Sequence, residues 1–119
     1  MSASILVCVT ARKECALLIR RGRQLSLDRA LPLHVLHISE SRAAQTARET
    51  GDILNELFHL AHECDAEMEI LYETDVPSAI CRYARDIGAQ TIVLGQGTSG
   101  LTRDLPLILP ECEIVVCQT

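Results

Sequence analysis

The residues best suited to binding a ligand form a glycine-rich loop, Gly95-Gln96-Gly97-Thr98-Ser99-Gly100. Glycine allows positive φ angles, so successive backbone N–H groups can turn toward one point. Such a concave group of donors attracts anions, phosphate in particular, and Thr98 and Ser99 add hydroxyl donors. The loop directly follows the apolar run Thr91–Leu94, which places it at the carboxyl end of a predicted strand. We therefore predict an anion site here, with a plain tight turn as the alternative.

No other set of side chains predicts catalysis or a metal site. The serines, cysteines and histidines do not follow the logic of a nucleophile, a base and an orienting acid. The six cysteines contain no C-x-x-C pair, and Cys8 and Cys117 lie inside apolar runs, where cysteine behaves as a small hydrophobic residue. We expect reduced thiols in a cytoplasmic protein, no catalytic residue and no metal.

Composition indicates one domain, residues 1–119, with 48% hydrophobic residues and a net charge of -5. A chain of this length can bury an adequate core without metals or disulfides. No signal peptide is evident, and no apolar run is long enough for a membrane span. The only dense basic group is Arg20, Arg21 and Arg23, with no interleaved aromatic residues. We expect no nucleic-acid binding and interpret these arginines as a solvated helix face rather than a phosphate site.

Apolar runs alternate with helical periodicities along the chain, which predicts an α/β fold with parallel strands. The first strand is apolar on both faces, so helices should cover both sides of the sheet in three layers. Pro106 and Pro110 should leave room only for a short helical turn between residues 101 and 110. The predicted strands are Ile5–Val9, Leu33–Ile38, Met68–Tyr72, Thr91–Leu94 and Glu113–Cys117. The first predicted helix follows Lys13. The second begins at Ser41 and has Leu54, Phe58 and Ala61 on its apolar face, and the third runs from Asp75 to Gly88.

Two of the loops that follow the predicted strands should meet at one edge of the sheet. In an open α/β sheet, ligands bind at the carboxyl ends of the strands, where the strand order reverses. Gly95 follows the fourth strand, and Thr10-Ala11-Arg12 follows the first. If those two strands are neighbours, the loops face each other across the crevice.

The last strand is apolar and should lie at an edge of the sheet, where unpaired backbone groups favour pairing with another chain. A symmetric pairing through Ile114, Val115, Val116 and Cys117 would give a two-fold homodimer.

Several segments resemble universal stress protein domains in the order in which that family has them. They are Ile5-Leu6-Val7-Cys8-Val9, Leu33-His34-Val35-Leu36-His37-Ile38, Val76-Pro77-Ser78-Ala79-Ile80-Cys81-Arg82-Tyr83-Ala84, Thr91-Ile92-Val93-Leu94-Gly95 and Gly97-Thr98-Ser99-Gly100-Leu101. The chain is also similar to the version of this domain in sensor kinases of bacterial potassium uptake. The resemblance implies a five-stranded parallel sheet of order 3-2-1-4-5, an adenine nucleotide alpha hydrolase-like fold and a frequent homodimer.

For one subgroup of the family, the resemblance also implies ATP or AMP in the crevice. Carried over to this sequence, the phosphate residues are Gly95, Gly97, Thr98, Ser99 and Gly100, and the adenosine residues are Val9, Thr10 and Val35. We therefore expect a non-catalytic regulatory domain that binds an adenine nucleotide.

The sequence departs from the nucleotide-binding subgroup at three places. Thr10 stands where those proteins have an aspartate, only Gln96 separates Gly95 from Gly97, and their later Gly-Ser or Gly-Thr pair is absent. These departures favour the alternative of a nucleotide-free dimeric interaction module. A third possibility, slow ATP hydrolysis, requires a metal-holding acid, for which Asp104 is the nearby candidate.

Overall fold

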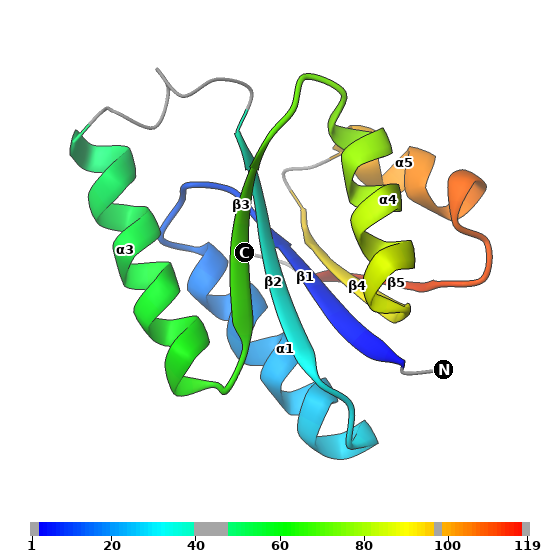
Figure 1. Ribbon diagram of the computed structural model, residues 1–119, viewed down its shortest axis with the longest axis horizontal. Helices are drawn as coiled ribbons and strands as arrows, with labels where there is room; N and C mark the ends of the chain where they lie inside the picture. The colour runs from blue at the N-terminus through cyan, green and yellow to red at the C-terminus, as the bar shows by residue number, and fades with distance from the viewer. Residues whose placement is uncertain (1–2, 40–47, 97–98, 118–119) are drawn as a thin grey trace.

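The computed structural model describes residues 3–39, 48–96 and 99–117, which form five strands and four helices (Figure 1). The elements are β1 (Ser4–Val9), α1 (Cys15–Arg29), β2 (Leu33–Ser39), α3 (Arg48–Glu63), β3 (Glu67–Tyr72), α4 (Val76–Ile87), β4 (Ala89–Gly95), α5 (Ser99–Ile108) and β5 (Glu113–Cys117). The sheet order is β3-β2-β1-β4-β5, and every neighbouring pair is parallel. The predicted strands, their order and the α/β class are confirmed.

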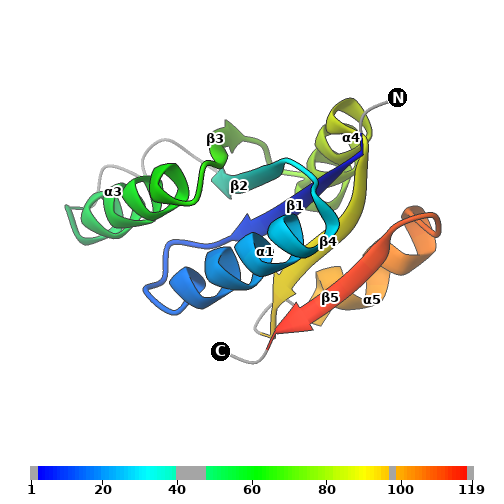
Figure 2. The same ribbon diagram turned by 90° about the horizontal axis from the view of Figure 1, so that it is seen from below.

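The helices cover both faces of the sheet, α1 and α3 on one side and α4 and α5 on the other (Figures 1 and 2). Because side chains alternate along a strand, Ile5, Val7 and Val9 of β1 face α1 and α3, whereas Leu6 and Cys8 face α4 and α5. Ile5, Leu6 and Val7 are all fully buried. The continuous apolar run of β1 is therefore the consequence of a strand covered on both faces.

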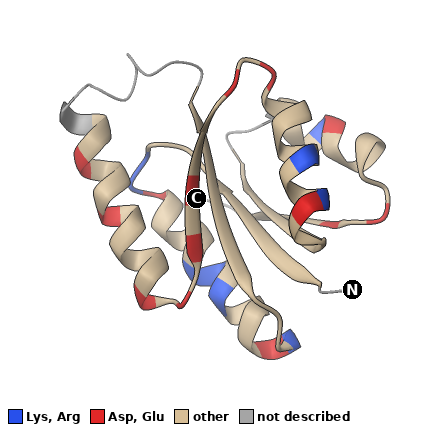
Figure 3. Cartoon of the chain, in the orientation of Figure 1, with Lys and Arg blue, Asp and Glu red and all other residues tan. Residues whose placement is uncertain are grey.

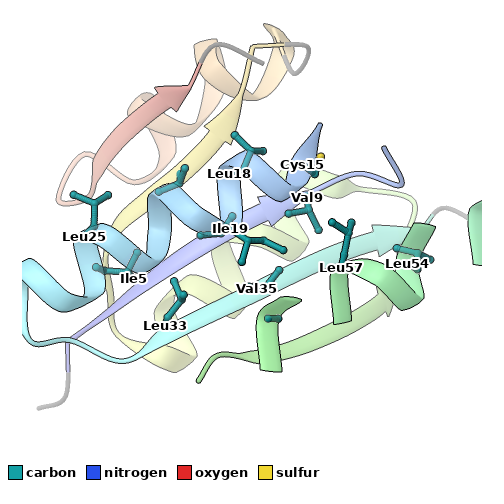
Figure 4. Packing of buried hydrophobic residues seen from close by; sticks show 13 residues of the cluster. Ile5, Val9, Cys15, Leu18, Ile19, Leu25, Leu33, Val35, Leu54 and Leu57 are labelled. Atoms are coloured by element: carbon teal, nitrogen blue, oxygen red, sulfur yellow. The ribbon is translucent and has the colours of Figure 1, made fainter. Parts of the chain in front are cut away.

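Helix α1 lies very close to β1 and β2. Figure 4 shows Leu18 and Ile19 of α1 pointing into the same core as Val35 of β2. Gly22 is buried in this contact, and a Cβ atom built there would clash with Cγ2 of Val7 and lie 3.0 Å from Cδ1 of Leu33. Gly22 is needed for close approach rather than for an unusual backbone angle.

The second core lies between the sheet and α4 and α5. Leu105 and Leu109 are fully buried there beside Leu94 of β4 and Ile80 of α4. The expectation of a short helical turn in this segment is wrong, because α5 runs from Ser99 to Ile108 and includes Pro106. The prolyl ring lies in the last turn, where one backbone bond is lost, and burial of leucines spaced four residues apart offsets that cost.

The ends of α4 agree with the sequence. Asp75 accepts a hydrogen bond from the backbone N–H of Ser78 at 3.2 Å, and Gly88 ends the helix with φ 66°. For α3, the predicted N-cap Ser41 lies outside the described residues. Leu54 and Ala61 are buried as predicted, but Phe58 is 39% exposed, because the apolar face is rotated toward Leu57.

Candidate functional site

The carboxyl ends of β1 and β4 lie side by side, as predicted. Val7 of β1 pairs with Val93 of β4 and with Val35 of β2. The chain leaves β1 toward β2 on one side and reaches β4 on the other, so the strand order reverses at β1. This edge is the switch point at which open α/β sheets bind ligands.

A small cavity opens on the α4 and α5 side of this edge, with a volume of about 50 Å³. Its lining is apolar except for Thr10. The lining residues are Cys8, Val9 and Thr10 from the end of β1, Leu36 and Ile38 from β2, Val76 and Ile80 from α4, and Leu101 from α5. The cavity is therefore formed by β1, β2, α4 and the start of α5, and no residue of β4 lines it.

The structure brings together two of the three residues expected on the adenosine side. Val9 and Thr10 line the cavity. Val35 does not, because it is fully buried in the core under α1 and α3. Leu36 and Ile38 form the β2 part of the cavity wall, and contact of Val35 with an adenosine stays a prediction.

The phosphate loop is described only in part. Gly95 is buried at the end of β4 and pairs with Cys117 of β5. Gly97 and Thr98 lie outside the described residues, and Ser99 begins α5. Gly100 lies in the first turn of α5, is exposed, and has no neighbouring atom within 4 Å of a built Cβ. Phosphate binding by these residues stays a prediction.

Two contacts fix the end of β1. Nδ1 of the buried His37 lies 3.0 Å from the carbonyl oxygen of Val9; since a carbonyl can only accept, Nδ1 carries the proton and donates. The backbone N–H of Thr10 points to Sγ of Cys15 at 3.4 Å. The wall of the cavity formed by Val9 and Thr10 is thus held from the far side of the sheet.

The histidines of β2 differ in their partners. His37 donates to Val9, whereas Nδ1 of His34 is buried without a hydrogen-bond partner within the described residues. The nearest charge is Oε2 of Glu67 at 3.9 Å.

Neither Cys8 in the cavity wall nor Asp104, the candidate metal-holding acid, is placed for chemistry at this cavity. Burial raises the pKa of Cys8 to about 12, so its thiol stays protonated and a poor nucleophile at neutral pH. Asp104 pairs with Arg103 on the surface of α5 at 3.2 Å and is not among the cavity residues. Across the part of the chain that the structure describes, no group of three or more His, Cys, Asp or Glu side chains converges to hold a metal.

Sequence reasoning missed most of the apolar wall. The missed residues are Cys8, Leu36, Ile38, Val76, Ile80 and Leu101. A signal for them exists in the sequence. Even-numbered residues of β1 and β2 share the face that receives α4, and Val76 and Ile80 are one helical turn apart.

The strand order and the helices on both faces define an adenine nucleotide alpha hydrolase-like fold. The model of the Universal stress protein family matches residues 1–107, and the chain belongs to this family. No curated protein sequence matches the chain. Within the described residues, no helix has both the length and the apolar character needed to cross a membrane.

Several solved structures have this fold. A universal stress protein from Archaeoglobus fulgidus matches with a TM-score of 0.72 and 19% identity, over 98% of this chain and 93% of that one. The Archaeoglobus fulgidus protein in complex with dAMP matches with a TM-score of 0.68 and 20% identity, over 96% of each chain. A universal stress protein in complex with cAMP gives a TM-score of 0.66 and 18% identity, over 99% of each chain.

Proposed function

We propose that this chain is a non-catalytic regulatory domain that binds an adenine mononucleotide at the carboxyl ends of β1 and β4. The observation that carries the proposal is the apolar cavity with one hydroxyl at its rim, at the switch point of the sheet. Similar structures of the family are complexes with dAMP and cAMP. In the proposed mode, the base lies against Leu36, Ile38 and Val76, and the phosphate lies against Thr10 and the loop 95–100.

The chemistry of the lining fits a purine, whereas the volume requires a change of shape. Pockets for small ligands usually span about 300–1,000 Å³, against about 50 Å³ here. Leu101 is the half-buried residue of this lining that lies in the first turn of α5. Movement of its side chain would widen the cavity toward the loop, so nucleotide binding should order or shift the start of α5.

Calorimetry with AMP, dAMP, cAMP, ADP and ATP, each with and without Mg²⁺, tests the proposal. Binding tighter than about 100 μM, or about 5.5 kcal/mol, is expected for at least one mononucleotide. Leu101→Phe should fill the cavity and weaken binding at least about tenfold. Leu107→Phe is the matched control, because Leu107 lies on the same helix and is 79% exposed. Equal affinity of the two variants would refute the assignment of the cavity.

The small cavity and Thr10 favour a second candidate, a nucleotide-free interaction module. Absence of heat with every nucleotide would support it. A regulatory role of this kind also agrees with the resemblance to the domain of potassium-uptake sensor kinases. We further propose that the domain is cytoplasmic, because its six cysteines are free thiols.

We further propose a homodimer through β5, because β5 is an edge strand and its Val116 is 46% exposed. Sedimentation should show a dimer that Val116→Glu converts to a monomer. Phe58→Glu is the control, since Phe58 is 39% exposed on α3, which packs beside β3 at the opposite edge of the sheet from β5. A wild-type monomer at every concentration would refute the dimer and leave the nucleotide site untouched.

A further inference from the structure

The outer face of α1 combines arginines with exposed leucines. Leu17 is 55% exposed and Leu27 is 62% exposed, and Arg20, Arg21 and Gln24 lie between them on the solvent side of the helix. Arg20 and Arg21 follow Leu17 by three and four residues, so they flank it one turn further along. We refer to Leu17, Arg20, Arg21, Gln24 and Leu27 as the basic face of α1.

The charge of this helix is opposite to that of the rest of the chain. Helix α1 has four arginines and one aspartate, a net charge of +3, whereas the whole chain has -5. The remainder of the chain therefore has a net charge of -8. Figure 3 shows basic residues along α1, with acidic residues along α3 and β3. A positive surface on an acidic protein concentrates its attraction for acidic partners at one place.

The two arginines of this face, Arg20 and Arg21, form no ion pair with a carboxylate of the described residues. Within the described residues Arg20 makes no hydrogen bond or ion pair. Arg21 donates to Oε1 of Gln24 at 3.3 Å, and its charge acts on Glu113 only at longer range, as one of the causes that lower the pKa of that carboxyl. By contrast, Arg29 pairs with Glu113 at 2.8 Å and Arg82 pairs with Glu73 at 3.0 Å. Positive charge is thus neutralised at those places and left available on the basic face.

A hollow of about 420 Å³ lies beside these arginines, lined by Leu17, Arg20, Arg21, Arg23, Gln24 and Cys64. Arg23 is already held there, since it donates to the carbonyl oxygen of Cys64 at 2.9 Å and lies 3.6 Å from Asp65. Arg23 therefore forms a fixed part of the rim of the hollow, while Arg20 remains available to bind a ligand. The hollow therefore offers both guanidinium groups and the apolar side chain of Leu17.

We propose that the basic face of α1 docks an acidic amphipathic helix of a partner protein. Carboxylates of the partner would pair with Arg20 and Arg21, and its apolar side chains would cover Leu17 and Leu27. The two leucines are separated by about 15 Å along the helix axis, a length that suits a helical segment of about three turns.

The same features disfavour other anionic partners. Free phosphate or a nucleic-acid backbone would neutralise the arginines but leave both leucines in water. A membrane surface requires a wide apolar face, whereas the apolar residues Leu18, Ile19 and Leu25 of α1 are buried against the sheet. A partner with both carboxylates and apolar groups would pair with the arginines and also cover the two leucines.

The test uses a synthetic amphipathic helical peptide of about four turns, with leucines on one face and glutamates on both flanks. Its affinity for the full chain is measured by fluorescence anisotropy at several salt concentrations. Binding should weaken steadily with salt, because the charges at such a rim are screened. The same peptide with lysines in place of the glutamates should not bind.

Variants locate the binding surface. Arg20→Glu with Arg21→Glu should weaken peptide binding at least about tenfold, whereas the charge-matched control Arg82→Glu with Arg103→Glu should not. Leu17→Ser should also weaken binding, while Leu107→Ser on the exposed side of α5 should leave it unchanged. Circular dichroism verifies that each variant is folded.

Four results would overturn the proposal. They are no binding of the acidic peptide, equal loss in the control variants, a response to inorganic phosphate or single-stranded DNA that matches the response to the peptide, and binding to phosphatidylserine vesicles with no binding to the peptide. Nucleotide titrations of the same variants should be unchanged, so this outcome is independent of the proposed cavity.

Discussion

Replacement of Gly22 by alanine should destabilise the protein although alanine is the better helix former. Gly22 lies in the middle of α1, where glycine to alanine is worth about 1 kcal/mol in favour of the helix. The added methyl group would overlap Cγ2 of Val7 and reach 3.0 Å from Cδ1 of Leu33. Both neighbours are buried, with exposures of 0% and 3%, so neither can move into solvent.

The size of the effect follows from these opposing contributions. Overpacking of a filled core costs about 1–3 kcal/mol, and Val7 is β-branched with few alternative rotamers. Since β1 is held between β2 and β4, we place the clash at the upper end of that range. The net loss should be about 1–2 kcal/mol, which corresponds to a fall in Tm of about 4–8 °C for a chain of this size.

Urea unfolding measures this change as a lower midpoint with an unchanged slope. Val7→Ala supplies the second arm of a double-mutant cycle, because it removes the methyl group that the new side chain would meet. Its cost should be smaller in the Gly22→Ala background than in the wild type, with a coupling of about 1 kcal/mol or more. A Gly22→Ala variant as stable as the wild type, or two equal costs for Val7→Ala, would refute the close-contact reasoning.

Three further predictions use the same structure. Gly100→Ala should raise stability by up to about 1 kcal/mol in urea unfolding, since its Cβ would enter open space; a loss of stability would contradict this. The pKa of Glu113 lies below its ordinary value, through the hydrogen bond and the charge of Arg29. The stability from this pair is present above the unfolded pKa and lost as pH falls through the lowered one, so unfolding midpoints of Arg29→Gln should depend less on acid than those of the wild type. Cys8, whose pKa burial raises to about 12, should react with a thiol reagent at pH 8 only after unfolding; rapid labelling of Cys8 in the folded protein, identified by peptide mapping, would disprove it.

The strands and their parallel pairing follow well from the sequence because they depend on strong, redundant signals, whereas the strand order was predicted from the resemblance to universal stress proteins. The apolar run from Ile5 to Val9 reports burial on both faces, and Asp75 and Gly88 mark helix ends by local hydrogen bonding and backbone geometry. The helix through Pro106 was not predictable in this way. Its stability depends on the burial of Leu105 and Leu109 in a core assembled from distant segments. A local rule on proline does not include the free energy of that burial.

The candidate site also has features that the sequence predicts and features that depend on tertiary packing. The order of the elements places Thr10 and Gly95 at carboxyl ends of strands, and the family resemblance predicts that these two strands are neighbours. The wall of the cavity depends on which face each strand residue takes, and a difference of one position separates Val35 in one core from Leu36 in the other. The approach of Leu101 from α5 depends on tertiary packing alone.

The central position of β1 has a consequence for biosynthesis. Ser4 in β1 bonds to the carbonyl oxygen of Ile87, 83 residues further along the chain. Within this domain β1 is synthesised before the other strands and can pair with β2 early, but its other edge stays unpaired until β4 has been made. During that interval a long apolar edge is open to wrong partners, so nascent chains halted before residue 89 should be good clients for chaperones.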